Sequence, residues 1–270
     1  MTEATTKDSR FDYGRVINRT LSAIGANLRV FALLTLILLG IPTAVIGAAA
    51  YGLYINGNFD EAALQGPGAM IFLLAPVVYI VLIAAVLSLQ AAIIHGVIVH
   101  LNGRQATLGE SLASGWRHWF IMVLISIVTG VAQTVGLLLF IVPGVLMMLA
   151  WSVAIPVRVA ERKGVFASME RSADLTRGRR GSLLGLFVLY SVATNIIQQI
   201  VQAIISTAVT MAAPSAAPSS LTILTPTIAA AAIMGFVISV VSAAGLASVY
   251  FELRSIREGV SPADLASIFD

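Results

Sequence analysis

The segment that decides the fold is residues 138–181, which read LLFIVPGVLMMLAWSVAIPVRVAERKGVFASMERSADLTRGRRG. Within it, Pro143 and Gly144 divide two apolar runs that carry no charge. A proline fits the first position of a helix, where its missing N–H would have had no partner, and a glycine permits a tight turn. The pair therefore predicts a turn between two helices.

The second apolar run ends in a cluster of charges. No formal charge occurs from Val145 to Val157, and the charged residues that follow are Arg158, Glu161, Arg162 and Lys163. Such a cluster is expected where a helix leaves the lipid. Beyond Gly164, the apolar residues at helical spacing are Val165, Phe166, Met169 and Ala173. This pattern predicts an amphipathic surface helix whose apolar side lies in the acyl boundary of the membrane.

The composition of the whole chain is typical of a membrane protein. Of its 270 residues, 58% are hydrophobic and 11% are charged, whereas about a quarter of a soluble globular protein is charged. The chain has no cysteine, which excludes disulfides and thiolate metal sites. Its first 28 residues are too polar for a cleavable signal peptide. We therefore expect the first span to act as an uncleaved anchor.

Apolar runs of sufficient length to cross a bilayer recur along the chain, since about 20 residues suffice. We predict an all-α, polytopic membrane protein with one domain, residues 11–270, preceded by a disordered cytoplasmic tail, residues 1–10. The six predicted spans are 30–51, 69–101, 119–141, 145–160, 182–211 and 228–252.

Amphipathic segments between the spans predict helices at the cytoplasmic interface. Residues 11–28 carry an apolar face made by Ile17, Leu21, Ile24 and Leu28, with Arg15 and Arg19 on the polar side. Residues 107–116 begin with Thr107 and Glu110, at the spacing of a capping box. Residues 261–270 begin with a serine, a proline and an acid in the order of a helix start.

The basic residues predict the orientation. All 16 Lys and Arg residues lie before the first span or after the second, fourth and sixth spans. Because basic residues are retained in the cytoplasm, both termini are predicted to be cytoplasmic. An arrangement with five or seven spans would place a basic cluster on the opposite side. The expected location is the cell membrane, as in a bacterial inner membrane.

The exits of the even-numbered spans resemble one another. Each exit has polar residues, then a glycine, then an amphipathic segment, and the glycines are Gly103, Gly164 and Gly259. This pattern predicts a threefold pseudo-repeat of helical hairpins in parallel orientation. The alternative is that any hairpin has to leave the membrane through polar residues and a turn.

Span five carries a polar face within the predicted membrane region. The residues of this face recur at helical steps and are Ser191, Asn195, Gln198, Gln202 and Ser206. Because amides in lipid are costly without partners, we expect this face to point into the bundle. Two interpretations stay open: the face lines a polar groove, or it joins helices through hydrogen bonds.

A basic surface and an absence of catalytic motifs complete the list of candidate sites. The candidate contacts of anionic phospholipid headgroups are Arg171, Arg177, Arg179 and Arg180. The acidic residues form no catalytic pair, and His95 and His100 diverge by about 140° on a helix. No nucleotide-binding or hydrolase motif occurs. We therefore expect no enzymatic activity, no cofactor, no metal site and no nucleic-acid partner.

Residues 143–181 contain a Pro-Gly pair, a Trp-containing span, a Pro-Val exit, a Glu, a Gly, an Arg-Ser pair and Leu-Thr-x-Gly. These residues are Pro143, Gly144, Trp151, Pro156, Val157, Glu161, Gly164, Arg171, Ser172, Leu175, Thr176 and Gly178. This pattern resembles the glycerophosphoryl diester phosphodiesterase membrane-domain family and the related YciC-like proteins. The resemblance implies a six-helix membrane domain linked to glycerophospholipid processes. The catalytic barrel of some members needs about 250 further residues, so we expect no phosphodiesterase activity.

Together these patterns predict a non-enzymatic integral membrane protein that acts as a scaffold or accessory protein at the inner leaflet. The expected partners are the lipid bilayer, anionic phospholipid headgroups and another membrane protein. The alternative is a transporter or lipid-handling protein that uses the polar face of span five. Access of water to Asn195 and Gln198 would distinguish the two functions.

Overall fold

The computed structural model describes residues 11–55, 69–212 and 221–258, and every regular element in these ranges is helical. The helices are α1 (Tyr13–Thr35), α2 (Ile41–Ile55), α3 (Ala69–Leu101), α4 (Leu108–Leu139), α5 (Ile141–Ala150), α6 (Ala154–Glu161), α7 (Val165–Thr176), α8 (Arg180–Ala212) and α9 (Leu221–Glu258). A π-helical segment, Leu36–Gly40, joins α1 to α2. The predicted tail 1–10 and the predicted helix 261–270 lie outside the described residues.

Six stretches of these helices are long and apolar enough to cross a membrane, which confirms the predicted all-α polytopic fold. The stretches are Tyr13–Ala49, Leu74–Leu101, Leu108–Leu139, Ile141–Glu161, Arg180–Ala212 and Ala229–Glu258. They correspond in order to the six predicted spans.

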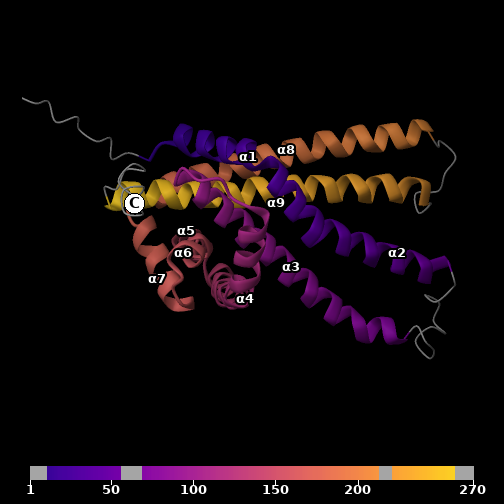
Figure 1. Cartoon of the computed structure of the whole chain (residues 1–270), viewed down its shortest axis with the longest axis horizontal. Helices are drawn as coiled ribbons and strands as arrows, with labels where there is room; N and C mark the ends of the chain where they lie inside the picture. The colour runs from indigo at the N-terminus through magenta and orange to yellow at the C-terminus, as the bar shows by residue number, and fades with distance from the viewer. Residues whose placement is uncertain (1–10, 56–68, 213–220, 259–270) are drawn as a thin grey trace, which may run out of the picture.

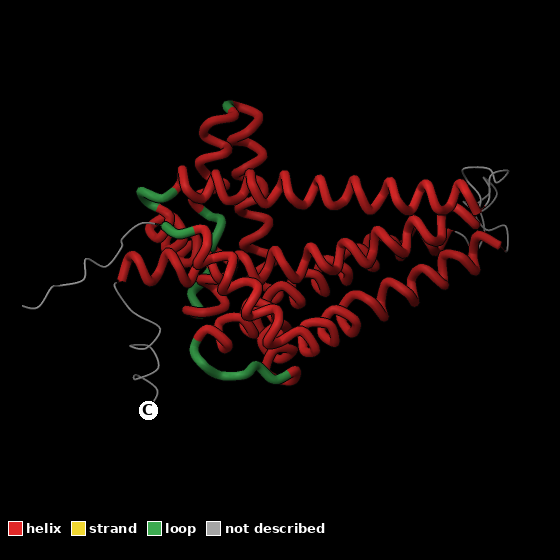
Figure 2. Tube along the Cα trace, turned by 90° about the horizontal axis from the view of Figure 1, so that it is seen from above, coloured by secondary structure: helices red, strands yellow, loops and turns green. Residues whose placement is uncertain are grey.

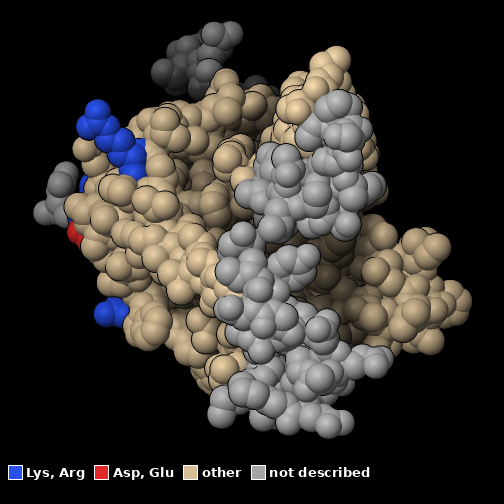
Figure 3. All heavy atoms as spheres, turned by 90° about the vertical axis from the view of Figure 1, so that its right-hand side faces the viewer, with Lys and Arg blue, Asp and Glu red and all other residues tan. Residues whose placement is uncertain are grey.

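The helices do not all run in the same direction. Helices α2, α3, α8 and α9 extend along the long axis of the molecule, and α1 begins at the end where α9 finishes (Figure 1). The hairpin of α4 and α5 runs across this axis and projects to one side (Figure 2). Seen from the end where α2 and α8 finish, charged side chains reach only the edge of the described surface (Figure 3). The molecule therefore combines a lengthwise bundle with a crosswise hairpin.

The first predicted span and the surface helix predicted before it form one continuous, bent helical segment rather than two separate helices. Asn27 interrupts α1 with φ −116° and ψ 18°, and its amide donates to the Ala23 carbonyl at 3.0 Å. Pro42 has no N–H to donate to the carbonyl four residues back, and the π-helical segment lies just before it. The packed side of α1 includes Val16, Thr20, Ala23, Asn27 and Phe31. Most of the predicted apolar face is exposed instead, namely Ile17, Leu21 and Leu28.

The turn of the crosswise hairpin lies at Phe140, before the predicted Pro143-Gly144 turn. Phe140 is extended, with φ −155° and ψ 128°, and Pro143 lies in the first turn of α5, where a missing N–H removes no helical hydrogen bond. Gly144 acts through its small size, because a Cβ there would lie 2.7 Å from the backbone nitrogen of Leu137. The glycine therefore allows α5 to approach α4, and the predicted Pro-Gly turn is corrected.

Helix α4 crosses α3 close to the start of α4. A Cβ on Gly115 would lie 2.5 Å from the Ser88 carbonyl oxygen, so the crossing requires glycine. At a neighbouring contact, a Cβ on Gly96 would lie 2.7 Å from the Phe31 ring. The main hydrophobic core surrounds these contacts and includes Leu34, Ile93, Ile94, Met122 and Ala247.

Two predicted helix boundaries differ from those of the structure. Thr107 accepts a hydrogen bond from the Glu110 N–H at 3.2 Å, which confirms the predicted cap. The helix that begins there does not end at residue 116, however, and α4 continues unbroken into span three. Helix α9 begins at Leu221, while its stretch that is apolar enough to cross a membrane begins at Ala229, close to the predicted start of span six at residue 228.

The three helical hairpins, formed by the first and second, third and fourth, and fifth and sixth spans, have similar sequences at their exits but are not arranged symmetrically. The middle hairpin runs across the other two (Figure 2). Gly103 has φ +79°, in the left-handed region that favours glycine, whereas Gly164 has φ −66° and caps the start of α7. Gly259 lies outside the described residues. Similar exits in the sequence therefore lead to different backbone geometries.

Candidate functional site

Span four is broken in its middle, and α7 stabilises the break. Helix α5 ends at Ala150 and α6 begins at Ala154, with Trp151 just after the end of α5. The Ser172 hydroxyl donates to the Ala150 carbonyl at 2.7 Å and accepts from the Val153 N–H at 3.2 Å. Ser172 is fully buried, so water does not replace these bonds. A serine from α7 thus completes the backbone hydrogen bonding of the broken helix.

Helix α7 packs against protein on the side that was predicted to face lipid. Met169 is buried with Ile125 and Ala154, and Val165 packs against this cluster, while Phe166 is exposed. The buried hydroxyl groups of α7 belong to Ser168, Ser172 and Thr176. These hydroxyls bond to backbone carbonyls of α5 and of the loop before α7. The segment is therefore a packed part of the site, and the predicted lipid-facing side is corrected.

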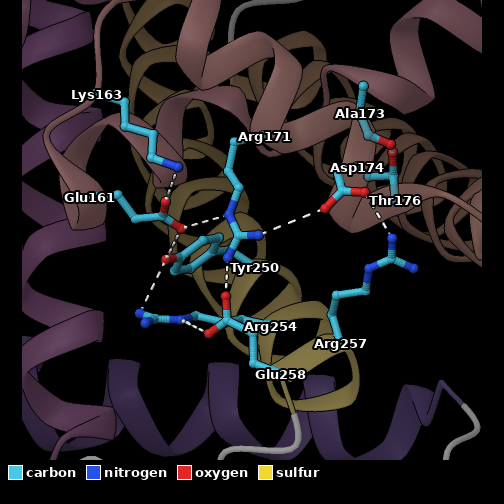
Figure 4. Close-up of polar contacts among 10 residues, drawn as sticks. All are labelled: Glu161, Lys163, Arg171, Ala173, Asp174, Thr176, Tyr250, Arg254, Arg257 and Glu258. Carbon is cyan, nitrogen blue, oxygen red and sulfur yellow. Dashed lines mark hydrogen bonds and ion pairs between the residues drawn. The ribbon is translucent and has the colours of Figure 1, made fainter.

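A network of polar side chains joins α6, α7 and α9 (Figure 4). Glu161, the last residue of α6, accepts hydrogen bonds from Arg171 Nε at 3.2 Å and from the Tyr250 hydroxyl at 3.0 Å. The Lys163 ammonium lies 2.9 Å from the other oxygen of the same carboxylate. One carboxylate therefore joins the end of α6 to α7 and to Tyr250 of α9, which is 89 positions away in the sequence.

The rest of the network lies at the end of α9. Glu258 pairs with Arg171 and with Arg254, whose Nε lies 2.7 Å from the carboxylate. Asp174 lies 2.8 Å from Arg257 and 3.8 Å from Arg171. Arg171 therefore contacts carboxylates from α6, α7 and α9, and we call the whole set the Arg171 network (Figure 4).

The Arg171 network joins α6, α7 and α9 through charged side chains. Burial lowers the pKa of the Arg171 guanidinium, and hydrogen bonds to Glu258 and Glu161 outweigh burial and raise it. Arg171 therefore stays charged. Each acid of the network has a cationic partner within 4 Å. Isolated surface pairs contribute about 0–1 kcal/mol, but pairs that share one arginine also impose a common geometry on three helices.

A separate ion cluster attaches α1 to α9. The Glu252 side chain is 1% exposed and lies 2.9 Å from Arg15 and 2.5 Å from Arg19. The Arg19 guanidinium also lies 5.3 Å from the centre of the Phe251 ring, at cation–π distance. Both arginines were predicted on the polar side of a surface helix. In the structure they neutralise a buried acid of another helix.

Of the remaining predicted lipid contacts, Arg177 and Arg179 lie in the loop between α7 and α8, where Gly178 has φ +79°, and Arg180 is the first residue of α8. A hollow of about 570 Å³ on one side of the loop is lined by Ala173, Asp174, Arg177, Gly178, Arg180 and Gly181. A hollow of about 420 Å³ is lined by Leu175, Arg177, Gly178, Arg179, Leu253, Ile256 and Arg257. Arg171 lies apart from this set, because the Arg171 network holds it.

The polar face of span five is exposed rather than packed inside the bundle. Its exposed residues on α8 are Ser191, Asn195, Gln198, Gln202 and Ser206. The Asn195 amide donates back along the helix to the Ser191 carbonyl at 2.7 Å. The predicted inward orientation is corrected because α9 covers only one side of α8 along this stretch (Figure 1). Two of the amides, Gln198 and Gln202, line a hollow of about 310 Å³ between α8 and α9.

Reasoning from the sequence found only part of this site. It singled out Glu161, Arg171 and Ser172, and it missed Tyr250, Glu252, Arg254 and Glu258. One signal was present, since Glu252 and Glu258 stand among arginines at the end of an apolar span, where a carboxylate near lipid needs a partner.

Among the residues that the structure describes, no group of three or more His, Asp or Glu side chains is placed to bind a metal ion. Comparisons of the chain with protein-family models, curated proteins and solved structures find no match. The geometry of the site itself is therefore the basis for its interpretation.

Proposed function

We propose that this chain is a non-enzymatic integral membrane protein, a scaffold or accessory protein, that binds anionic glycerophospholipid headgroups through the loop 177–180. The observation that carries the proposal is the hollow of about 570 Å³ with Arg177 and Arg180 in its wall. The acid in the same wall, Asp174, is already paired with Arg257. The cationic groups of the wall are therefore suited to an external anion.

The charge distribution around the loop supports this proposal. The acids of the Arg171 network are paired within the network, and Arg177 has no carboxylate partner among the described residues. Helix α8 begins at Arg180, and the N–H groups of a first helical turn attract anions. A phosphate diester accepts hydrogen bonds from guanidinium groups with good geometry. These features together match the headgroup of an anionic phospholipid.

The proposed orientation follows from the basic residues. Since basic segments are retained in the cytoplasm, we propose that the end where α1 begins and α9 finishes faces the cytoplasm at the inner leaflet of the cell membrane. The resemblance of residues 143–181 to the glycerophosphoryl diester phosphodiesterase membrane-domain family supports a role in glycerophospholipid-related processes. A second membrane protein is the proposed partner of the scaffold.

Lipid binding by charge-matched variants tests the proposal. Purified protein is titrated with phosphatidylglycerol and, separately, with phosphatidylcholine, and binding is measured by native mass spectrometry. Each basic residue near a headgroup contributes about 1 kcal/mol, so Arg177→Gln with Arg180→Gln should weaken phosphatidylglycerol binding by about 30-fold. Arg104→Gln with Arg117→Gln removes the same charge at two exposed arginines outside the hollow and should weaken binding less than the loop variant does. Equal losses in both double variants would contradict a site at the loop.

Transport or lipid handling along span five is a second candidate function. The observation in its favour is the hollow lined by Gln198, Gln199 and Gln202. Single cysteines through residues 191–206, treated with membrane-impermeant maleimides, test it, because the natural chain has no cysteine. Labelling of cysteines on the polar face, with no labelling of cysteines at the neighbouring positions, would support a water-filled path. An unreactive face would favour the scaffold.

A further inference from the structure

We infer that the α4–α5 hairpin lies in the plane of the membrane, embedded in the acyl chains of the leaflet at the basic end of the molecule, and does not cross the bilayer. The first observation is its direction: α4 is seen end-on in Figure 1, and the hairpin runs across the lengthwise helices in Figure 2. A bilayer crossed by those lengthwise helices therefore has the hairpin lying within its plane.

The hairpin leaves the bundle at a well-defined crossing. Gly115 packs on the Ser88 carbonyl of α3, and the next buried residues of α4 are His118, Met122 and Ile125. After Ile125, the next buried residue of α4 is Gly136, which packs on α5 within the hairpin. From the crossing to its end, α4 extends for about 36 Å. The outer half of the hairpin is therefore in contact mainly with itself.

The projecting part of the hairpin has the surface of a lipid-embedded element. Residues 118–157 contain no Asp, Glu, Lys or Arg. One side of α4 exposes an unbroken apolar row, Phe120, Leu124, Ile127, Val131, Val135 and Leu138. At the tip, Leu138 is 81% exposed and Phe140 is 70% exposed. The Thr129 hydroxyl donates to the Ile125 carbonyl at 2.7 Å and so needs no water. Acyl chains favourably cover such an apolar row.

The charges at the base of the hairpin place it at one leaflet. Arg117 and Arg158 border the uncharged segment on its two sides. Basic residues at both ends of an uncharged segment keep those two ends at the same, basic side of the bilayer. The distribution of basic residues is the same whether the hairpin crosses or lies flat, because both of its ends stay on the basic side. The charge pattern that predicts six spans is therefore equally compatible with this arrangement.

Depth measurements with single spin labels test the inference. Cysteine variants Leu124→Cys, Val131→Cys and Leu138→Cys, all at exposed positions on one side of α4, are labelled and reconstituted in phospholipid vesicles. Collision rates with oxygen and with a water-soluble nickel complex give the depth of each label. A flat hairpin should place the three labels within about 3 Å of one depth. A crossing helix would place the label at 131 about 10 Å deeper than the other two.

Helix α8 provides the matched control, because its exposed positions Val188, Ile196 and Ile204 lie on a lengthwise helix. Its central label should be the deepest of the three. A depth maximum at 131 like that of α8 would overturn the inference. Loss of collisions with both reagents, together with dipolar broadening between labels, would also overturn it, because a second copy of the chain would then cover the hairpin.

The accessibility of the tip gives an independent result. In sealed vesicles, Phe140→Cys should resist an impermeant maleimide applied from the side where α2 and α8 finish, while Gln105→Cys should react only from the basic side. Labelling of the residue-140 thiol from the α2–α8 side would show that the hairpin crosses, and would contradict the inference. Both positions are exposed, so neither substitution disturbs the core.

Discussion

The Ser172→Ala substitution removes the hydroxyl that joins the two sides of the break in span four. This hydroxyl accepts from the Val153 N–H at 3.2 Å and donates to the Ala150 carbonyl at 2.7 Å. Thr176 also donates to that carbonyl, at 3.4 Å, so the carbonyl keeps a partner in the variant. The Val153 N–H loses its partner in a fully buried position, which costs about 1–3 kcal/mol. We expect the free energy of unfolding to fall by about 2 kcal/mol.

Ser248 provides a matched control for this substitution. Ser248 is also fully buried, and its hydroxyl donates to the Ala244 carbonyl at 3.0 Å, four residues back along α9. That carbonyl also accepts the ordinary helical N–H bond, so Ser248→Ala leaves no backbone group without a partner. Its free energy of unfolding should fall by no more than about 0.5 kcal/mol.

The two variants are compared by reversible unfolding in mixed micelles of a mild detergent and dodecyl sulfate. Tryptophan fluorescence reports the transition, because Trp151 lies at the break. The expected difference of about 1.5 kcal/mol corresponds to a little more than tenfold in the unfolding equilibrium. Equal losses in Ser172→Ala and Ser248→Ala would refute the reasoning, because the hydroxyl would then not bridge the break.

Three further substitutions test contacts between helices by the same unfolding assay. Glu252→Gln should lower the free energy of unfolding by about 2–4 kcal/mol, because it leaves two arginines without their buried acid; Glu110→Gln, in an exposed pair at 3.8 Å, should lower it by less than about 0.5 kcal/mol. Gly115→Ala would place a Cβ 2.5 Å from an α3 carbonyl and should cost about 1–3 kcal/mol, whereas Gly109→Ala, with open space around it, should stabilise by up to about 1 kcal/mol. Arg171→Gln should cost about 1–3 kcal/mol, and a cost unchanged by added salt would contradict a role through ion pairs. If Glu252→Gln and Glu110→Gln lowered the free energy of unfolding equally, the buried ion pairs of Glu252 would be contradicted. If Gly115→Ala and Gly109→Ala had equal effects, the close contact at Gly115 would be contradicted.

Features that depend on neighbouring residues were predictable from the sequence. The apolar runs identified the six candidate spans, because a helix satisfies its backbone hydrogen bonds within one segment. The spacing of Thr107 and Glu110 identified the start of α4, because the cap joins residues three positions apart. The motif in residues 143–181 marked the serine and the arginine that later proved to lie in the site.

Features that depend on a distant partner were not predictable in the same way. The polar row on α8 has helical spacing, but spacing does not tell which sides of the helix a neighbour covers. Tyr250 bonds Glu161 across 89 positions of sequence, and the periodicity of neither segment indicates that pairing. The two arginines of α1 had the expected positions on their helix and an unexpected buried partner in Glu252.

The sequence by itself determined that this chain forms apolar helices, where α3 and α8 begin and end, and that basic residues gather between alternate spans. The tertiary structure alone decided that α4 crosses α3 at Gly115, that the hairpin turns at Phe140, and that Arg171 is shared by three carboxylates. The physical reason is the range of the interactions. Helical hydrogen bonds and caps join residues up to four positions apart, whereas crossing directions and ion pairs depend on the shape and charge of segments that meet only in the folded chain.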